Sequence, residues 1–107
     1  MYCMTVSYLK SDEATFDFDY YENSHLVLVQ DKFGPLGLKK IILRKDIGSK
    51  PGAGNKFFAS VDLVFDSIES MKTALATAGA DVNDDVANYT NAKVEYSFAS
   101  LAVVVDD

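Results

Sequence analysis

The chain has 107 residues, which fits one domain over residues 1–107, and its 49% hydrophobic and 24% charged residues are typical of a globular protein. Its 10 basic and 16 acidic residues give a net charge of −6, which disfavours a nucleic-acid partner. One cysteine, no signal-peptide pattern and no apolar run near the ~18 residues of a membrane span exclude a disulfide scaffold and a membrane partner. We therefore expect a cytoplasmic protein.

The first predicted elements are a strand and a helix. Residues 2–9 alternate between two sets of side chains rich in β-formers, which predicts a strand. Asp17 is a good N-cap for the following helix, and Phe16 and Tyr21 have the spacing of a hydrophobic staple. Gly34-Pro35 is expected to end this helix. Its apolar face is predicted to carry Phe18, Tyr21, His25, Leu28 and Val29.

Two further strands are predicted over residues 38–45 and 57–65. The segment 46–55 between them contains three glycines and a proline, which indicates a mobile loop. In the second of these strands, alternation places Phe57 on one face and Phe58 on the other. The first of these faces is expected to consist of Phe57, Ala59, Val61, Leu63 and Phe65.

The last part of the chain predicts a helix and a final strand. Asp66 is expected to cap the helix, and Gly79 is placed where a terminating glycine belongs. The apolar stripe of this helix is predicted to consist of Ile68, Met71, Leu75 and Ala78. A short turn is expected over 81–87, and a strand over 92–105 that carries Val94, Tyr96 and Phe98 on one face.

The element order is therefore βαββαβ. With right-handed crossovers, this order predicts an α+β ferredoxin-like sandwich, a four-stranded antiparallel sheet with both helices on one face. We expect the other face to carry large apolar or aromatic side chains, which on a monomer would leave an unusually large exposed patch. A homodimer in which two sheets pack together, a dimeric α/β barrel, would cover it. The space left between helices, sheet and partner is the natural ligand pocket.

Three segments resemble a known family. Residues 16–25, FDFDYYENSH, are similar to the F-D-x-x-Y-Y-x-x-x-H opening of the EthD family. Residues 87–91, ANYTN, resemble that family's P-x-Y-T-N segment, and residues 65–69, FDSIE, resemble its strand-to-helix junction. The chain departs from the family at Val27 and Ala87, where prolines are common.

The resemblance implies a dimeric α/β barrel, in agreement with the fold predicted from the element order. The family is named for a protein needed in bacterial degradation of ethyl tert-butyl ether, and its members mostly lack an established reaction. The resemblance therefore specifies the fold more closely than the function.

His25 is the one side chain that titrates near neutrality when unperturbed. One interpretation is a partly buried, hydrogen-bonded histidine that supports the fold; the other is a general acid or base in a pocket lined by tyrosines. A lone histidine does not make a closed zinc site, so we expect no metal or other cofactor, and nothing specifies haem.

Tyr21 is one turn from His25, so the two side chains can approach each other, and Tyr89 belongs to a family-like segment. These three residues are the candidate catalytic set. The candidate ligand-binding residues are Phe18, Tyr20, Asp62 and Tyr96, although packing also explains the two tyrosines and a solvated strand end also explains the carboxylate. The acidic pairs Asp84-Asp85 and Asp106-Asp107 are expected at the surface and in the tail, and Asn88 and Asn91 in turn hydrogen bonds.

Three functional hypotheses follow. The first is an enzyme or accessory protein of oxidative or catabolic metabolism, which binds a small apolar or aromatic molecule beside His25. The second is a non-catalytic module that binds and delivers such a molecule. The third, which depends on fold analogy alone, is a cofactor-free monooxygenase or isomerase of the dimeric α/β barrel type.

Overall fold

The computed structural model describes residues 1–46 and 56–105. Residues 47–55, within the predicted mobile loop, lie outside the described residues, as do Asp106 and Asp107 of the predicted tail. The elements in chain order are β1 (Tyr2–Leu9), α1 (Phe18–Tyr20), a π-helical turn (Tyr21–His25), α2 (Leu26–Phe33), a 3₁₀ turn (Gly34–Leu36), β2 (Leu38–Lys45), β3 (Phe57–Phe65), α3 (Ile68–Asp84), a second 3₁₀ turn (Val86–Asn88) and β4 (Val94–Ser100).

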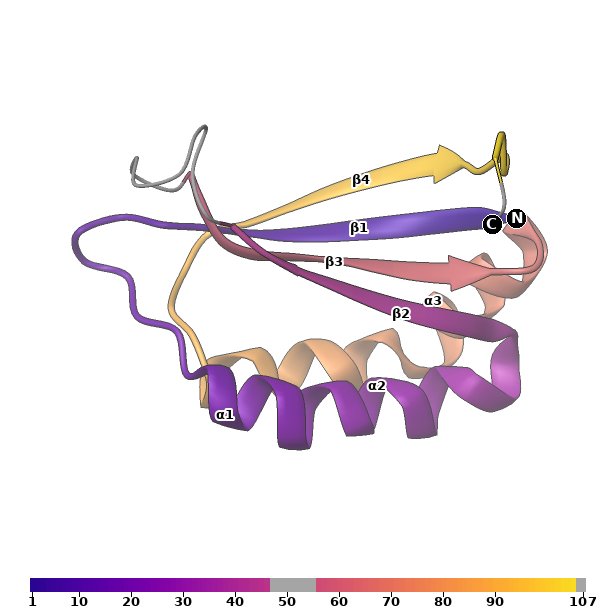
Figure 1. Ribbon diagram of the computed structural model, residues 1–107. Helices are drawn as coiled ribbons and strands as arrows, with labels where there is room; N and C mark the ends of the chain where they lie inside the picture. The colour runs from indigo at the N-terminus through magenta and orange to yellow at the C-terminus, as the bar shows by residue number, and fades with distance from the viewer. Residues whose placement is uncertain (47–55, 106–107) are drawn as a thin grey trace.

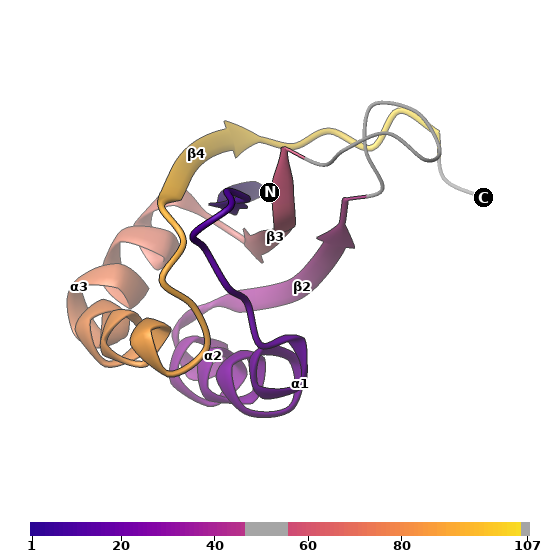
Figure 2. The ribbon, with the colours of Figure 1, turned by 90° about the vertical axis from the view of Figure 1, so that its left-hand side faces the viewer.

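The strands form one antiparallel sheet in the order β2-β3-β1-β4. Figure 1 shows α1, α2 and α3 on the same side of this sheet, and Figure 2 shows the opposite face without a helical layer. The predicted α+β ferredoxin-like fold is confirmed.

The first helix begins as predicted and contains a wide turn that the sequence did not indicate. The Asp17 side chain accepts a hydrogen bond from the backbone N–H of Tyr20, and the rings of Phe16 and Tyr21 lie 5.0 Å apart. The backbone N–H of Leu26 then bonds to the carbonyl oxygen of Tyr21, five residues earlier, as in a π-helix. The helical segment ends in the 3₁₀ turn at Gly34–Leu36, as expected. Its buried side chains are Tyr21, His25, Val29 and Phe33.

Three predictions for the last third of the chain were wrong. Ser67, not Asp66, is the N-cap of α3, because its backbone is extended and its side chain accepts the N–H of Ser70. Gly79 does not end the helix: a terminating glycine needs a positive φ, and among the described glycines only Gly37 has one. The helix continues to Asp84, and β4 is shorter than expected, at Val94–Ser100.

The inner face of the sheet packs on the helices. The hydrophobic core contains Met4, Val6 and Tyr8 from β1, and Val61, Leu63 and Phe65 from β3. The stripe of α3 that faces them differs from the prediction, since Ala74 is buried and Ile68 is 41% exposed. The exposure follows from the position of Ile68, which is the first residue of the helix.

The outer face of the sheet carries polar pairs at its centre, so the expectation of large aromatic side chains there was wrong, although the register also places Ile42 and Val64 on this face. Alternation along β1 places Thr5 and Ser7 on this face. The register sets them opposite Asp62 and Ser60 of β3. Thr5 donates a hydrogen bond to Asp62 (2.7 Å), and the hydroxyls of Ser7 and Ser60 are 2.8 Å apart.

An irregularity in the register moves one aromatic side chain to the helical side. The pairing of β1 with β3 shifts between Tyr8 and Leu9, so that Leu9 lies opposite Phe57. Phe58, predicted on the opposite face from Val61 and Leu63, packs with them against the core, and its ring stacks on Phe16 at 5.5 Å. The register shift therefore adds an aromatic side chain to the core.

Candidate functional site

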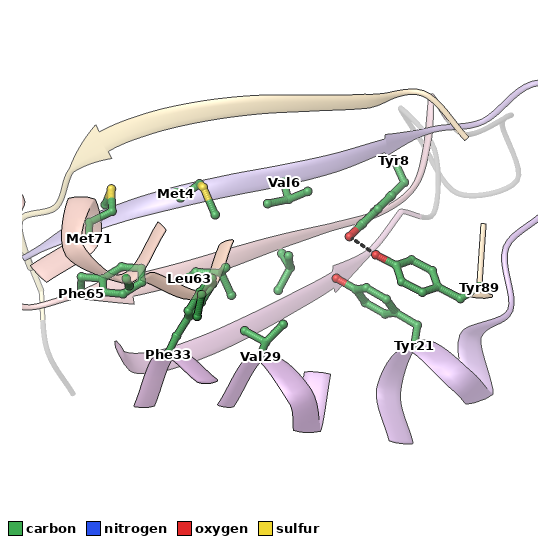
Figure 3. Packing of buried hydrophobic residues seen from close by; sticks show 13 residues of the cluster. Met4, Val6, Tyr8, Tyr21, Val29, Phe33, Leu63, Phe65, Met71 and Tyr89 are labelled. Atoms are coloured by element: carbon green, nitrogen blue, oxygen red, sulfur yellow. Dashed lines mark hydrogen bonds between the residues drawn. The ribbon is translucent and has the colours of Figure 1, made fainter. Parts of the chain in front are cut away.

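A cavity of about 310 Å³ lies between the sheet and the helices of one chain. Most of its wall is aliphatic and comes from both layers: Met4, Val6, Val61 and Leu63 from the sheet, and Val29, Leu75 and Val82 from the helices. Figure 3 shows several of these side chains facing one another across the gap. The cavity suits a small apolar molecule.

His25 contributes a nitrogen to this apolar wall. It lies at the end of the π-helical turn, lines the cavity and is only 3% exposed. Its Nδ1 atom is 2.9 Å from Oδ2 of Asp85. Because a carboxylate only accepts hydrogen bonds, Nδ1 carries the hydrogen and Nε2 is left with a lone pair. Within the described residues Nε2 has no hydrogen-bond partner, so this lone pair is available to a molecule in the cavity.

Two further side chains hold Asp85 in place. The hydroxyl of Tyr20 donates to Oδ1 of Asp85 (2.7 Å), and the amide of Asn88 donates to the same oxygen (2.8 Å). The amide also reaches the Tyr20 hydroxyl at 3.3 Å. The carboxylate is therefore hydrogen-bonded through both oxygens, and its second oxygen fixes the orientation of the imidazole.

The charge states of His25 and Asp85 follow from burial and from these hydrogen bonds. Burial lowers the pKa of His25, and the hydrogen bond to Asp85 opposes this shift only in part. Burial also disfavours ionisation of Asp85, but hydrogen bonds from His25, Asn88 and Tyr20 outweigh it and hold the carboxyl pKa below its usual value. At neutral pH the pair therefore consists of a neutral imidazole and a carboxylate.

A cluster of tyrosines adjoins the imidazole. The hydroxyls of Tyr8 and Tyr89 are 2.7 Å apart, and the ring of Tyr89 lies 4.5 Å from that of His25. Tyr21 stacks on His25 at 5.5 Å with an interplanar angle of 16°. Burial raises the pKa of Tyr8, Tyr21 and Tyr89, so that all three hydroxyls keep their hydrogens and act as donors.

The structure brings only some of the candidate residues to the cavity. His25, Tyr21 and Tyr96 line it. Tyr89 lies behind this lining and contacts His25 and Tyr8. Tyr20 bonds to Asp85 instead of reaching the cavity.

Phe18 and Asp62 lie outside the cavity lining. Phe18 packs on Phe16 at 4.6 Å and lies under the ammonium group of Lys45 at 5.3 Å. Asp62 lies on the outer face of the sheet, hydrogen-bonded to Thr5, with Arg44 at 3.8 Å. Alternation along β3 turns its side chain away from the helices, and hence from the cavity.

Three residues of the site were missed in the sequence. Asp85 was expected at the surface, yet its carboxylate is the hydrogen-bond partner of His25. Asn88 was expected to bond to turn backbone and instead holds Asp85, whereas Asn91 does bond to backbone groups, those of Thr15 and Glu13. Tyr8 was placed only in a strand. No local pattern marks these residues, because the contact between His25 and Asp85 spans 60 positions.

Among the described residues, no group of three or more His, Cys, Asp or Glu side chains comes together in a way that would hold a metal ion. None of the helices in residues 1–46 and 56–105 is long and apolar enough to cross a membrane.

Comparison with known proteins supports the family resemblance at the level of structure. No family model and no curated protein matches the chain. An EthD-like protein from Ralstonia eutropha is 28% identical, with a TM-score of 0.87 over 97% of this chain and 94% of that one. An ethyl tert-butyl ether degradation (EthD) family protein from Bacillus halodurans is 22% identical, with a TM-score of 0.62 over 89% and 96%. The resemblance to the EthD family is thus confirmed.

More distant structures share the fold. SnoaB, a cofactor-independent oxygenase from Streptomyces nogalater, is 10% identical, with a TM-score of 0.67 over 99% of this chain and 96% of that one. Two further proteins of similar fold, from an uncultured marine organism and from Thermobifida fusca, are described as dimeric ferredoxin-like proteins. At these identities the similarity concerns the fold alone.

Proposed function

We propose that this EthD-like chain binds a small apolar or aromatic molecule in the cavity between sheet and helices, and that His25 takes a proton from it. One observation carries the proposal: Nδ1 of a buried histidine is bonded to Asp85, while the same ring lines an apolar cavity. This arrangement leaves Nε2 as a proton acceptor at the ligand.

The surroundings of His25 suit this role. At neutral pH the imidazole is neutral and can accept a proton. The imidazolium that forms on proton uptake is stabilised by the negative charge of Asp85. Tyr20 and Asn88 act as positioning residues through the carboxylate. Tyr89 packs on the imidazole and restricts its rotation.

Proton abstraction is testable without knowledge of the natural substrate. A suitable probe is 2-tetralone, a small bicyclic ketone with acidic C–H bonds next to its carbonyl. Exchange of these protons for deuterium in D₂O can be followed by NMR. We expect the wild-type chain to accelerate the exchange, His25→Gln to abolish the acceleration, and Asp85→Asn to reduce it by about 10-fold or more. Equal exchange with wild type and His25→Gln would contradict the role of His25.

A second pair of variants tests whether the cavity is the binding site. Gly79 lies in the wall of the cavity, and a Cβ atom there would meet only Leu75 at 3.9 Å. Gly79→Leu should therefore fold and fill the cavity, with loss of exchange activity. Ala76→Leu, on the exposed side of the same helix, is the matched control and should leave exchange unchanged.

The apolar wall also supports the alternative of a carrier that binds its ligand without chemistry. That alternative predicts saturable binding of 2-tetralone that Gly79→Leu abolishes, with no exchange above the His25→Gln level. A cofactor-free oxygenase, the activity for which SnoaB is described, predicts instead oxygen uptake with phenols in metal-free buffer.

We also propose that the chain forms a homodimer through the outer face of its sheet. Proteins of similar fold are described as dimeric, and no helix covers this face in Figure 2. The face is polar at its centre, so the contact would depend on hydrogen bonds and charge pairing more than on apolar burial.

A further inference from the structure

The hydroxyl of Tyr21 makes no hydrogen bond of ordinary length, although the hydroxyl of Tyr8 is its neighbour. Among the described residues it is the one fully enclosed side-chain oxygen or nitrogen atom without a hydrogen-bond partner, whereas Nε2 of His25 is open to the cavity. A buried hydroxyl left in this state costs about 1–3 kcal/mol. Folded proteins seldom keep such a group unless something else satisfies it.

The neighbouring hydroxyls leave a second hydrogen unused. Tyr8 and Tyr89 make one hydrogen bond with each other, so one of their two hydroxyl hydrogens has no acceptor. Together with the hydrogen of Tyr21, two donors remain without an acceptor in the described structure. Figure 3 shows the three hydroxyls pointing toward one another at one end of the space between Val6 and Val29.

The donors converge from three parts of the chain on a site that lacks an acceptor. Tyr8 comes from β1, Tyr21 from the π-helical turn and Tyr89 from the segment before β4. Tyr8 and Tyr21 both line the cavity, as does His25. A proton acceptor and two hydrogen-bond donors thus adjoin the same apolar space.

We propose that Tyr21 and the Tyr8–Tyr89 pair form a binding site for an oxygen atom of the ligand, which is therefore a neutral ketone or phenol on an apolar body. This inference rests on the proposed function. When Nε2 of His25 takes a proton from carbon next to the carbonyl, the electron pair of the broken C–H bond shifts toward the oxygen to give an enolate. The tyrosine hydroxyls donate to that oxygen, and their hydrogen bonds strengthen as its negative charge grows.

The wall of the cavity argues for a neutral ligand instead of a carboxylate. No lysine or arginine is among the described residues that line it, and Asp85 already places a negative charge behind His25. A carboxylate would enter without a counter-ion, which is costly in an apolar site. A hydrocarbon, in turn, would leave the tyrosine hydroxyls unpaired.

Three naphthalene probes of similar size test the inference: 2-naphthol, 2-methylnaphthalene and 2-naphthoate, with dissociation constants from fluorescence titration. We expect 2-naphthol to bind about fivefold or more tightly than 2-methylnaphthalene, the factor that one net hydrogen bond supplies, and 2-naphthoate to bind most weakly. Tyr21→Phe removes one of the two donors, so it should lower the preference for 2-naphthol and leave binding of 2-methylnaphthalene unchanged. Tyr2→Phe, which also removes one hydroxyl but lies outside the lining of this cavity, should keep the preference.

The outcomes separate this inference from the proposed function. Equal binding of 2-naphthol and 2-methylnaphthalene, a preference that is undiminished in Tyr21→Phe, or tightest binding of 2-naphthoate would overturn the oxygen site while leaving an apolar binding cavity. Failure of all three probes to bind the wild-type chain would overturn both. A preference that depends on Tyr21 in a chain that shows no His25-dependent exchange would support the oxygen site and reject the proton acceptor.

Discussion

His25 shows what the sequence could predict of the site and what it could not. Its four-residue spacing from Tyr21 predicts that both lie on one helical face, and the structure buries both. Asp85 directly follows α3, in a part that the sequence assigned to a separate short turn beyond Gly79. A hydrogen bond between positions so far apart depends on how the helices pack, and residue patterns do not specify that.

The burial of His25 should make folding stability depend on pH. Folding lowers the pKa of His25 below its ordinary value of about 6.5, so below that pH the unfolded chain binds a proton that the folded chain does not. The free energy of unfolding should therefore fall as the pH drops from about 6.5 toward the pKa of the folded state. Urea denaturation of wild type and His25→Gln between pH 5 and 7.5 measures this pH dependence. As the pH is lowered over this range, the free energy of unfolding should fall more for the wild type than for the variant. A wild-type advantage that grows toward pH 5 would contradict the lowered pKa.

Two tyrosine variants should differ in stability although each loses one buried hydroxyl. Tyr89→Phe leaves the Tyr8 hydroxyl without its 2.7 Å partner and should cost about 1–3 kcal/mol. Tyr21→Phe removes a hydroxyl that has no partner and should leave the free energy of unfolding unchanged or slightly raised. Chemical denaturation at pH 7.5 compares them, and equal losses would show that Tyr21 does have a partner in solution.

At the scale of elements, alternation and capping residues predicted the first two-thirds of the chain well. The bounds of β1, β2 and β3 match their predicted ranges closely, because period-two patterns with β-formers are strong local signals. The errors at Asp66 and Gly79 have one cause. A capping residue or a terminating glycine is recognised by its backbone angles, and adjacent candidates such as Asp66 and Ser67 cannot be separated without them.

The turn between α2 and β2 provides a test of such backbone requirements. Gly37 has φ +108°, and a Cβ atom there would lie 2.6 Å from Cβ of Ser70. Gly37→Ala should lower the free energy of unfolding by more than about 1 kcal/mol, since neither the backbone nor the packing accepts alanine. Gly79 lies within α3, and a Cβ atom there would meet only Leu75, at 3.9 Å, so Gly79→Ala should be neutral or stabilising by about 0.4–1 kcal/mol. Thermal unfolding measures the stability of both variants. Equal changes in stability would show that Gly37 is not required by its backbone angle and packing.

At the scale of the whole molecule, the order of elements predicted the sandwich, but the composition of its outer face was predicted wrongly. Connectivity and handedness leave few ways to arrange βαββαβ, so the fold follows from the order of elements. The composition of a face depends on register, and the shift beside Tyr8 places Phe58 against the core. The polar pairs Thr5–Asp62 and Ser7–Ser60 occupy the centre of the outer face instead.

The proposed dimer can be tested at the centre of that face. Ser60 is only 3% exposed there, and its hydroxyl contacts Ser7. Ser60→Lys would place a long cation between two facing sheets and should shift the sedimentation coefficient from dimer to monomer at micromolar concentration. Ser24→Lys adds the same charge to the exposed side of the π-helical turn and should leave the assembly unchanged. A wild-type chain that sediments as a monomer would reject the proposed dimer.

The π-helical turn sets the direction of Tyr21 and His25 relative to the rest of the first helix. Buried side chains recur here every four residues, at Tyr21, His25, Val29 and Phe33, and in a regular α-helix such a series would rotate by about 40° per step. The wide turn offsets part of that rotation. Val29 and Phe33 therefore face the sheet, while Tyr21 and His25 face the tyrosine cluster. Removing the extra residue of this turn would therefore rotate Tyr21 and His25 relative to Val29 and Phe33 by about 100°, and would take the imidazole away from the tyrosine cluster.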